Sequence, residues 1–244
     1  MPTFTAFVSD LHLSSSRPEA NRVFLTFLTE VASKADGLYI LGDLFEYWAG
    51  DDDLGDAFNR SIVAGLAATA SGGVPVMLMH GNRDFLMSRT FANTTGAILL
   101  PDPTSVDLYG TRTLLMHGDT LCTEDQRYQS FRRRVRSAFA QRLFMLQPLS
   151  WRRAEIERAR RISESEKRTK SAQIMDVTPE AVTEAFRECG CDRLIHGHTH
   201  RPARHEHVVD GRRCERWVLS DWYQTGQYLR VTRDGCESIL LPFR

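Results

Sequence analysis

A carboxylate and an imidazole with one residue between them, Asp10 and His12, follow the first short apolar run of the chain. Alternate residues of an extended chain point to the same side, so these two side chains could hold one metal ion. A second apolar run, 38–41, is followed by Gly42 and Asp43, where the glycine frees the backbone to place a carboxylate at the end of a buried strand. On its own, a Gly-Asp pair more often forms a turn than a catalytic site.

Three further strand-like runs, 74–79, 113–116 and 193–195, also end in glycine-containing turns that carry Asn, Asp or His. The turns read H-G-N-R-D, H-G-D and H-G-H-T-H in chain order. The strands of an α/β sheet place functional residues beyond their carboxyl ends, so these turns are expected to meet at one edge. Together the strand ends supply seven nitrogen and oxygen donors: Asp10, His12, Asp43, Asn82, His117, His198 and His200.

Seven donors are too many for one ion and suit two ions that share a carboxylate, as in dinuclear hydrolases. Asp43 is the natural shared ligand. The donor types, without thiolate, indicate manganese, iron, zinc or magnesium and do not choose among them. Arg83, next to Asn82, offers a planar guanidinium for phosphate oxygens. We therefore expect a metal-activated water to attack phosphorus, with Asn82, Arg83 and the metals stabilising the developing charge.

The elements that must position these donors alternate along the chain. Apolar residues spaced three and four apart predict helices over 18–35 and 58–70. Short strands are predicted at 217–220, 228–231 and 239–241, with Asp221 and Trp222 near the rim of the site and no chemical role demanded of either. The acidic run 51–53 is expected to be a solvated loop with a helix cap. His80 and His196 precede the turn glycines and are expected to pack, with orientation of the metal ligands as the alternative. No role is assigned to His205 and His207.

Charge is distributed unevenly in this chain of 244 residues. Its 31 basic and 31 acidic residues cancel, so the net charge does not indicate a nucleic-acid partner. Residues 127–170 nevertheless contain fourteen Lys or Arg and four Glu, a net charge of +10. Residues 131–146 have helical apolar spacing, and Pro148 separates this amphipathic helix from a second helical stretch that begins near Trp151. This segment is either a solvated helical cap or a surface that meets anionic lipid headgroups.

Cysteine spacing and hydropathy bear on the compartment. Five cysteines, odd in number and irregularly spaced, form neither a disulfide framework nor a zinc knuckle, which favours a reducing cytosol. The sequence has no run of about eighteen apolar residues and no basic start followed by an apolar run. We expect a protein that is neither exported by a standard signal nor membrane-spanning.

The ordered motifs D-x-H, G-D, G-N-x-D, H-G-D and G-H-T-H resemble the calcineurin-like metallophosphoesterase superfamily over most of the chain outside 121–176. The resemblance implies an α/β fold, a two-sheet sandwich flanked by helices (αββα), as a single domain over 1–244 with an inserted helical lid at 121–176. It also implies a metal-bridging hydroxide as nucleophile and two ion sites, one held by Asp10, His12, Asp43 and His200 and the other by Asp43, Asn82, His117 and His198. Most members have a His after the motif's Asn, whereas this chain has Arg83, so general-acid catalysis by that His is excluded.

Longer motifs are similar to one branch of that superfamily, the UDP-2,3-diacylglucosamine diphosphatases of lipid A biosynthesis. They are G-D-L-F-E-Y-W-A-G-D-D-D from Gly42, H-G-N-R-D-F from His80, H-G-D-T-L-C-T from His117 and I-H-G-H-T-H-R-P from Ile195. The similarity implies two Mn²⁺ ions and hydrolysis of the pyrophosphate of UDP-2,3-bis(3-hydroxyacyl)glucosamine to UMP and 2,3-diacylglucosamine 1-phosphate (lipid X). It further implies an enzyme peripheral to the cytoplasmic face of the inner membrane. We expect a monomer.

The same similarity assigns roles to the lid and to its polar neighbours. The apolar inner face of the lid would shelter the acyl chains and is expected to include Phe131, Phe139, Leu143 and Leu146. The polar part of the substrate would contact Asn82, Arg83, Asp125, Ser163, Lys167, Lys170 and His198. Two alternatives stay open. A metallophosphoesterase for a soluble phosphodiester or nucleotide sugar would not need an apolar lid, and a non-catalytic interaction scaffold with this fold would hold no metals.

Overall fold

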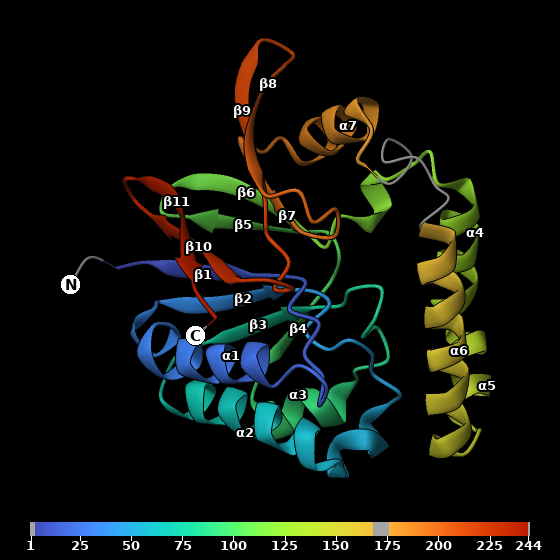
Figure 1. Cartoon of the computed structure of the whole chain (residues 1–244). Helices are drawn as coiled ribbons and strands as arrows, with labels where there is room; N and C mark the ends of the chain where they lie inside the picture. Colours follow the sequence, from blue (N-terminus) through green and yellow to red (C-terminus); the bar gives the residue numbers. More distant parts are fainter. Residues whose placement is uncertain (1–2, 168–175, 244) are drawn as a thin grey trace.

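Two β-sheets pack face to face, with helices on both outer faces, in a computed structural model that describes residues 3–167 and 176–243 (Figure 1). The first sheet, in the order β11-β10-β1-β2-β3-β4, contains β1 (Thr5–Val8), β2 (Gly37–Leu41), β3 (Val76–Met79), β4 (Ile98–Leu100), β10 (Gly226–Thr232) and β11 (Gly235–Leu241). The second, in the order β5-β6-β7-β9-β8, contains β5 (Thr104–Leu108), β6 (Thr111–Met116), β7 (Arg193–His196), β8 (Ala203–Val209) and β9 (Arg212–Val218).

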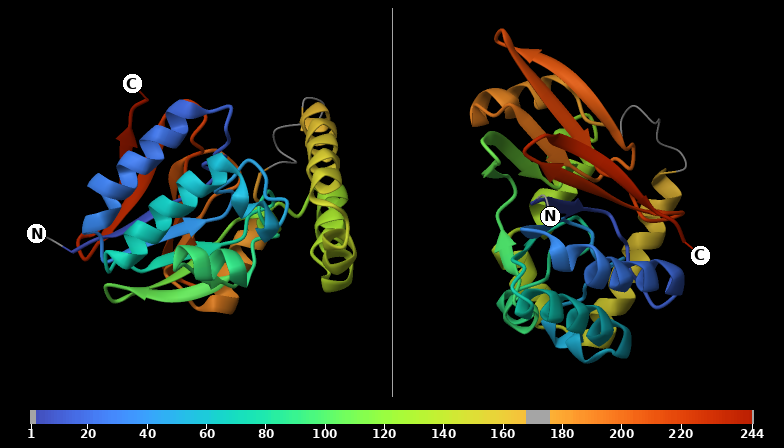
Figure 2. Two further views of the ribbon diagram at one scale, coloured as in Figure 1. Left: turned by 90° about the horizontal axis from the view of Figure 1, so that it is seen from below. Right: turned by 90° about the vertical axis from the view of Figure 1, so that its left-hand side faces the viewer.

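The helices form two groups. Those against the sandwich are α1 (Pro18–Glu30), α2 (Ala57–Ser71), α3 (Arg89–Thr95) and α7 (Pro179–Cys189), with short 3₁₀ helices η1 (Ala32–Lys34), η2 (Asp51–Gly55) and η3 (Asp119–Leu121). The others are α4 (Gln126–Val135), α5 (Ala138–Met145) and α6 (Leu149–Lys167), which stand beside the sandwich in Figure 1 and in the left view of Figure 2. We call α4, α5 and α6 the lid helices.

Buried apolar side chains form three layers in the interior. The helical spacing predicted near the start of the chain places Phe24 and Phe27 of α1 against the outer face of the first sheet, together with residues from α2 and α3. A second layer lies between the sheets, where Phe7 of β1 and Ile195 of β7 belong to one cluster. The third lies between the second sheet and α7, around Phe186. These layers confirm the expected αββα sandwich.

Parallel pairing sets the direction of the strands that matter for function. In the first sheet β1, β2 and β3 are parallel neighbours, and in the second sheet β6 and β7 are parallel neighbours. The carboxyl ends of parallel strands lie at the same edge of a sheet. Each donor-bearing turn predicted from the sequence therefore follows a strand that ends at such an edge.

The helix expected over 131–146 is not continuous. It is broken because Arg136 ends α4 and the Ser137 hydroxyl caps α5 by accepting a hydrogen bond from the Ala140 backbone N–H at 3.3 Å. Among the cysteines, Cys189 and Cys191 are paired in a disulfide, and Cys122, Cys214 and Cys236 are thiols. The pair joins residues only two apart and closes no loop between elements, so it is not a disulfide framework.

Candidate metal centre

The strand ends are locked together by backbone hydrogen bonds. Pairing of β1 with β2 continues past both strands, from Asp10 N to Gly42 O at 3.1 Å and from His12 N to Asp43 O at 3.0 Å. One bond joins the two sheets directly, because His198 N donates to Asp10 Oδ2 at 2.8 Å. The donor turns of both sheets therefore meet at one place.

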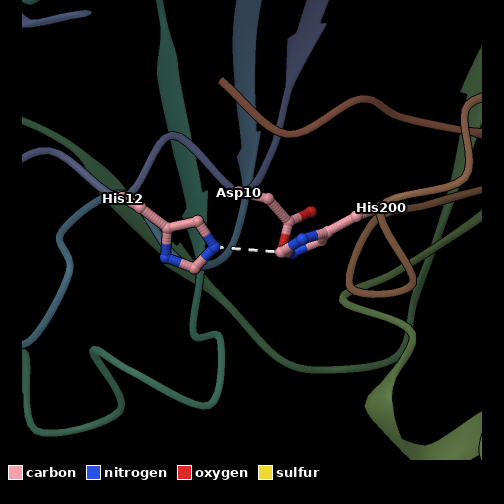
Figure 3. Close-up of side chains that lie close together, drawn as sticks. All are labelled: Asp10, His12 and His200. Carbon is pink, nitrogen blue, oxygen red and sulfur yellow. Dashed lines mark hydrogen bonds and ion pairs between the residues drawn. The ribbon is translucent and has the colours of Figure 1, made fainter. Parts of the chain in front are cut away.

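Three of the predicted ligands form a first group at this junction. Asp10 Oδ1 lies 3.4 Å from His200 Nε2, and His12 Nε2 lies 3.4 Å from the same nitrogen. Figure 3 shows the side chains of Asp10, His12 and His200 directed toward one another from two separate loops. Asp43 Oδ2 lies 4.0 Å from His12 Nε2, which connects this group to the next.

The second group surrounds Asn82. Its Oδ1 lies 3.1 Å from His117 Nε2 and 3.0 Å from His198 Nδ1. Asp10, Asp43 and His117 also offer ligand atoms that all lie within 4.8 Å of one another. The structure thus brings all seven predicted donors into one cluster, in which Asp10, His12, Asp43 and His117 are buried and Asn82, His198 and His200 are half-buried. Asp10 Oδ1 is buried without a hydrogen bond from the described residues, and the donors are all nitrogen or oxygen, so the residues fit divalent cations.

The backbone of five predicted ligands lies in the left-handed region. Their φ angles are 54° at Asp10, 49° at His12, 53° at Asp43, 70° at His198 and 56° at His200. Non-glycine residues seldom adopt positive φ, and such strain clusters at functional sites. Two other non-glycine residues with positive φ in the described chain, Tyr109 and Asp210, precede glycines in hairpin turns, where this conformation is ordinary.

The glycines of two motifs are needed for close packing around the ligands. A Cβ on Gly81 would lie 2.0 Å from Asp43 Oδ1 and 2.3 Å from Asp43 N. A Cβ on Gly197 would lie 2.2 Å from Asp10 Oδ2. No side chain fits at either position, which explains why H-G-N and H-G-H turns follow β3 and β7.

The cluster has more buried acid than its neighbours neutralise. Burial raises the pKa of Asp43 to about 7, and Asp84 and Asp10 add to this effect. Although burial opposes it, the negative charges of Asp43, Asp10 and Asp119 raise the pKa of His117 to about 9. Burial and then the positive charge of His117 lower the pKa of His198 to about 3, so this ring stays neutral and able to bind a metal. Bound cations would take the place of the protons held by Asp43 and His117.

Arg83, the predicted phosphate-binding residue, lies at the edge of the cluster. Its backbone N–H donates to Asp43 Oδ1 at 2.8 Å, and its guanidinium lies 3.4 Å from Glu46 Oε1. Asp84, which follows it, has no role in the sequence analysis but holds two loops, accepting from Leu44 N at 2.7 Å and from Gly81 N at 2.8 Å. The sequence feature that could have indicated this role is the aspartate at the end of the G-N-R-D turn.

Three of the four remaining predicted substrate residues lie on a lid helix or directly before one. The Asp125 carboxylate caps α4 by accepting from Tyr128 N at 3.0 Å, and Ser163 is exposed on α6. Lys167 is the last residue of α6, and its side chain lies outside the described part, as does Lys170. Substrate contacts by these four residues stay predictions.

The acidic run after β2 is not the solvated loop expected from the sequence. Asp53 is buried and forms an ion pair with Arg153, and Asp52 forms one with Arg152. The side chain of Arg152 is only 1% exposed and also donates to the Ala49 carbonyl. The run is therefore the anchor of lid helix α6, and its charges are used within the protein.

A second anchor, also missed from the sequence, joins α4 to the loop after β6 of the second sheet. The buried Asp119 carboxylate accepts hydrogen bonds from the Tyr128 hydroxyl at 2.6 Å and from Arg132 Nε at 2.7 Å. The Tyr128 ring lies 5.9 Å from the ring of the predicted ligand His198, measured between centroids. Asp119 belongs to the H-G-D motif, and helix α4 is thereby joined to the turn that carries His117.

A cavity of about 480 Å³ lies between α5 and the loop after β3. Its apolar lining comes from the core loop residues Phe85, Leu86 and Met87 and from Met145 of α5. The four apolar lid residues expected to face a cavity do not line this one. Phe139 is 80% exposed and Leu146 is 74% exposed, and Phe131 and Leu143 are also exposed.

Two of the other histidines and the residues expected near the rim have defined surroundings. His80 Nε2 faces the Met87 carbonyl at 2.9 Å, and His196 is fully buried. Trp222 lies beside the site through its backbone N–H, which donates to Asp10 O at 3.1 Å, while its side chain is fully buried in the core. Its neighbours reach the first ligand group: Asp221 Oδ2 lies 3.5 Å from His200 Nδ1, and the Tyr223 ring stacks on His12 with centroids 5.1 Å apart. Tyr223 had no signal in the sequence motifs.

Comparison with known proteins identifies relatives along nearly the whole chain. The profile of the calcineurin-like phosphoesterase family matches residues 5–202. A UDP-2,3-diacylglucosamine hydrolase of Aromatoleum aromaticum is 51% identical, over 92% of this chain and 91% of that protein. Proteins with the same description from Serratia proteamaculans and Pseudomonas aeruginosa are 46% and 48% identical, over 98% and 97% of this chain and 99% and 98% of theirs.

Among solved structures, an archaeal phosphodiesterase shares the fold. Its TM-score is 0.51 at 12% sequence identity, over 98% of this chain and 100% of the other. At this identity the likeness concerns the fold alone.

Proposed function

Because the chain belongs to the calcineurin-like phosphoesterase family and matches UDP-2,3-diacylglucosamine hydrolases along nearly its whole length, we propose that it is a metal-dependent hydrolase of UDP-2,3-bis(3-hydroxyacyl)glucosamine in lipid A biosynthesis. It cleaves the pyrophosphate bond and releases UMP and 2,3-diacylglucosamine 1-phosphate. The observation that supports this most directly is the cluster of seven nitrogen and oxygen donors at the junction of the two sheets.

We propose that two Mn²⁺ ions bind here, with Asp43 as the shared ligand. One would be held by Asp10, His12, Asp43 and His200, and the other by Asp43, Asn82, His117 and His198. Such ions act as Lewis acids and lower the pKa of a water molecule that attacks phosphorus. Arg83 follows Asn82 at the edge of the cluster, and its guanidinium can bind and stabilise the negative charge that develops on the phosphate oxygens.

Substrate recognition would involve the lid helices. We propose that the cavity beside Phe85, Leu86 and Met87 shelters acyl chains, with charged residues such as Asp51 and Arg136 elsewhere in its lining. The preference for a lipid-linked substrate over a soluble nucleotide sugar rests on the relatives described as UDP-2,3-diacylglucosamine hydrolases. The polar part of the substrate would contact Asn82, Arg83, Asp125, Ser163, Lys167, Lys170 and His198.

One assay tests the activity and both alternatives. The purified protein is given UDP-2,3-diacylglucosamine, UDP-glucose or a chromogenic phosphodiester, with and without Mn²⁺. We expect manganese-dependent release of UMP from the acylated substrate only. Comparable turnover of UDP-glucose would favour a soluble substrate, and a protein that neither binds nor responds to divalent ions would be a non-catalytic scaffold.

The variant Asp43→Ala tests the proposed shared ligand. It should bind less metal and lose turnover, because both ions lose one carboxylate. Circular dichroism controls for folding. A folded Asp43→Ala protein with near-normal manganese-dependent activity would contradict the assignment.

We also propose that the lid helices meet the cytoplasmic face of the inner membrane. Within the described residues, no helix is both long enough and apolar enough to cross a bilayer. The lid instead exposes Phe139 and Leu146 on a segment with a large excess of arginine, a combination that suits an anionic lipid surface.

Sedimentation with lipid vesicles tests this surface. The wild-type protein should pellet with vesicles that contain anionic phospholipid and much less with neutral ones. Phe139→Ser combined with Leu146→Ser should reduce binding. Val208→Ser is the matched control, because Val208 on β8 is as exposed as Leu146, at 74% for each, and lies on a different element. Equal losses in the control and the lid variant would refute the proposed surface.

A further inference from the structure

Glu46 has no assigned role, yet its carboxylate lies between three functional parts of the molecule. Oε2 lies 3.6 Å from His12 Nδ1, on the proposed ligand. Oε1 lies 3.4 Å from Arg83 Nη1 and accepts a hydrogen bond from Arg160 Nη1 of α6 at 3.1 Å. The side chain of Glu46 is only 7% exposed, so these contacts take place away from bulk water.

Backbone pairing holds the loop that carries Glu46 beside the loop that carries His12. An isolated parallel bridge pairs Leu13 with Phe45, and Glu46 N donates to Leu13 O at 2.9 Å. The loops that carry His12 and Glu46 are thus hydrogen-bonded to each other immediately beyond the proposed ligands. The backbone of Glu46 cannot move away from that of His12 without breaking this pairing, and the contacts of Oε1 with Arg83 and Arg160 hold the carboxylate itself.

The contacts have a specific chemical consequence for His12. Its Nε2 faces the donor cluster and its Nδ1 faces Glu46. A metal-binding histidine usually gives its other ring N–H to a carboxylate or carbonyl, which fixes the tautomer and makes the ring a better ligand. Glu46 is placed to accept that N–H with one oxygen while its other oxygen holds two guanidinium groups.

We propose that Glu46 is a positioning residue that couples the docking of lid helix α6 to metal binding at His12 and to the orientation of Arg83. The inference rests on the proposed metal site and activity. When α6 is docked, Arg160 holds the Glu46 carboxylate in line with His12 and Arg83. Since coupling between two binding events is reciprocal, metal at His12 should also favour the docked helix.

The test uses Glu46→Gln, Arg160→Gln and the double variant in the full-length protein. Arg153→Gln is the matched control, because Arg153 also anchors α6 to the core, through Asp53 and Asp56. Calorimetry gives the Mn²⁺ dissociation constants, and hydrogen exchange of α6 with and without Mn²⁺ gives the docking of the helix. Neither readout depends on turnover.

Glu46→Gln should weaken the binding of one Mn²⁺ by about tenfold or more. Arg160→Gln should weaken the same site by a smaller factor and have no further effect when Glu46→Gln is present. Mn²⁺ should slow exchange in α6 of the wild-type protein, and this protection should be lost in both single variants. Arg153→Gln should speed exchange in α6 and leave Mn²⁺ affinity unchanged.

Wild-type Mn²⁺ affinity in Glu46→Gln, or an undiminished effect of Arg160→Gln in the double variant, would overturn the coupling. If Glu46→Gln does not fold, Arg160→Gln against Arg153→Gln decides the question, because equal Mn²⁺ affinities in these two would refute it. A wild-type protein that binds no Mn²⁺ and hydrolyses no substrate would instead refute the proposed function.

Discussion

Gly81→Ala adds one methyl group where the structure has no room for it. The new Cβ would lie 2.0 Å from Asp43 Oδ1 and 2.3 Å from Asp43 N, more than about 1 Å inside normal contact distance. The carboxylate could rotate, but the backbone nitrogen cannot, so the loops after β2 and β3 must separate. Overpacking of this kind costs about 1 to 3 kcal/mol of stability. At about 2 to 4 °C per kcal/mol for a chain of this size, the melting temperature should fall by about 2 to 12 °C.

The functional effect of this variant should exceed the loss of stability. The shift displaces Asp43 and the adjacent Asn82, two proposed ligands, and misplacement by about 1 Å can cost about a hundredfold in rate. We would measure melting in EDTA, which removes the stabilising effect of bound metal, and kcat/KM in saturating Mn²⁺. Gly55→Ala is the control, because its Cβ would meet nothing within 4 Å. A Gly81→Ala protein with wild-type metal affinity and activity would refute the packing argument.

Three other predictions concern the proton balance and the lid anchors. Because the pKa of His117 without bound metal is raised to about 9, and a ligand must be unprotonated, Mn²⁺ affinity should rise as pH increases from 7 to 9. Titration calorimetry would detect this rise, and an affinity that does not vary with pH would contradict the prediction. Arg152→Met removes the guanidinium that donates to the buried Ala49 carbonyl, so α6 should lose about 1 to 3 kcal/mol of protection in hydrogen exchange. Unchanged protection would count against the anchor. Tyr128→Phe removes the 2.6 Å hydrogen bond to buried Asp119 and should lower stability by about 1 to 3 kcal/mol in urea unfolding, whereas a stability equal to wild type would argue that this bond contributes nothing.

The lid shows where sequence patterns were insufficient. Three aspartates in a row are ordinarily solvated, and the partners that bury Asp53 and pair with Asp52 lie about a hundred residues later, on α6. The excess of arginine in the lid segment was visible in composition, but composition does not identify which arginines pair with core acids and which face solvent. Apolar spacing predicted that residues near Phe139 are helical, but it could not determine that they stay exposed, because burial depends on what the helix packs against.

The amino-acid sequence by itself identified the seven donors, and its resemblance to a known superfamily implied the sandwich. Apolar runs that end in glycine, acid and imidazole are local patterns, and the carboxyl ends of parallel strands lie at one edge of each sheet. That the two edges meet is seen only in the tertiary structure, where His198 N donates to Asp10 Oδ2. Only the tertiary structure decided how that cluster is supported: Asp84 beneath the ligand loops, Tyr223 on His12, and Glu46 between His12 and Arg160. These are contacts between residues far apart in the chain. Their strength depends on distance and burial, which no spacing along the sequence specifies.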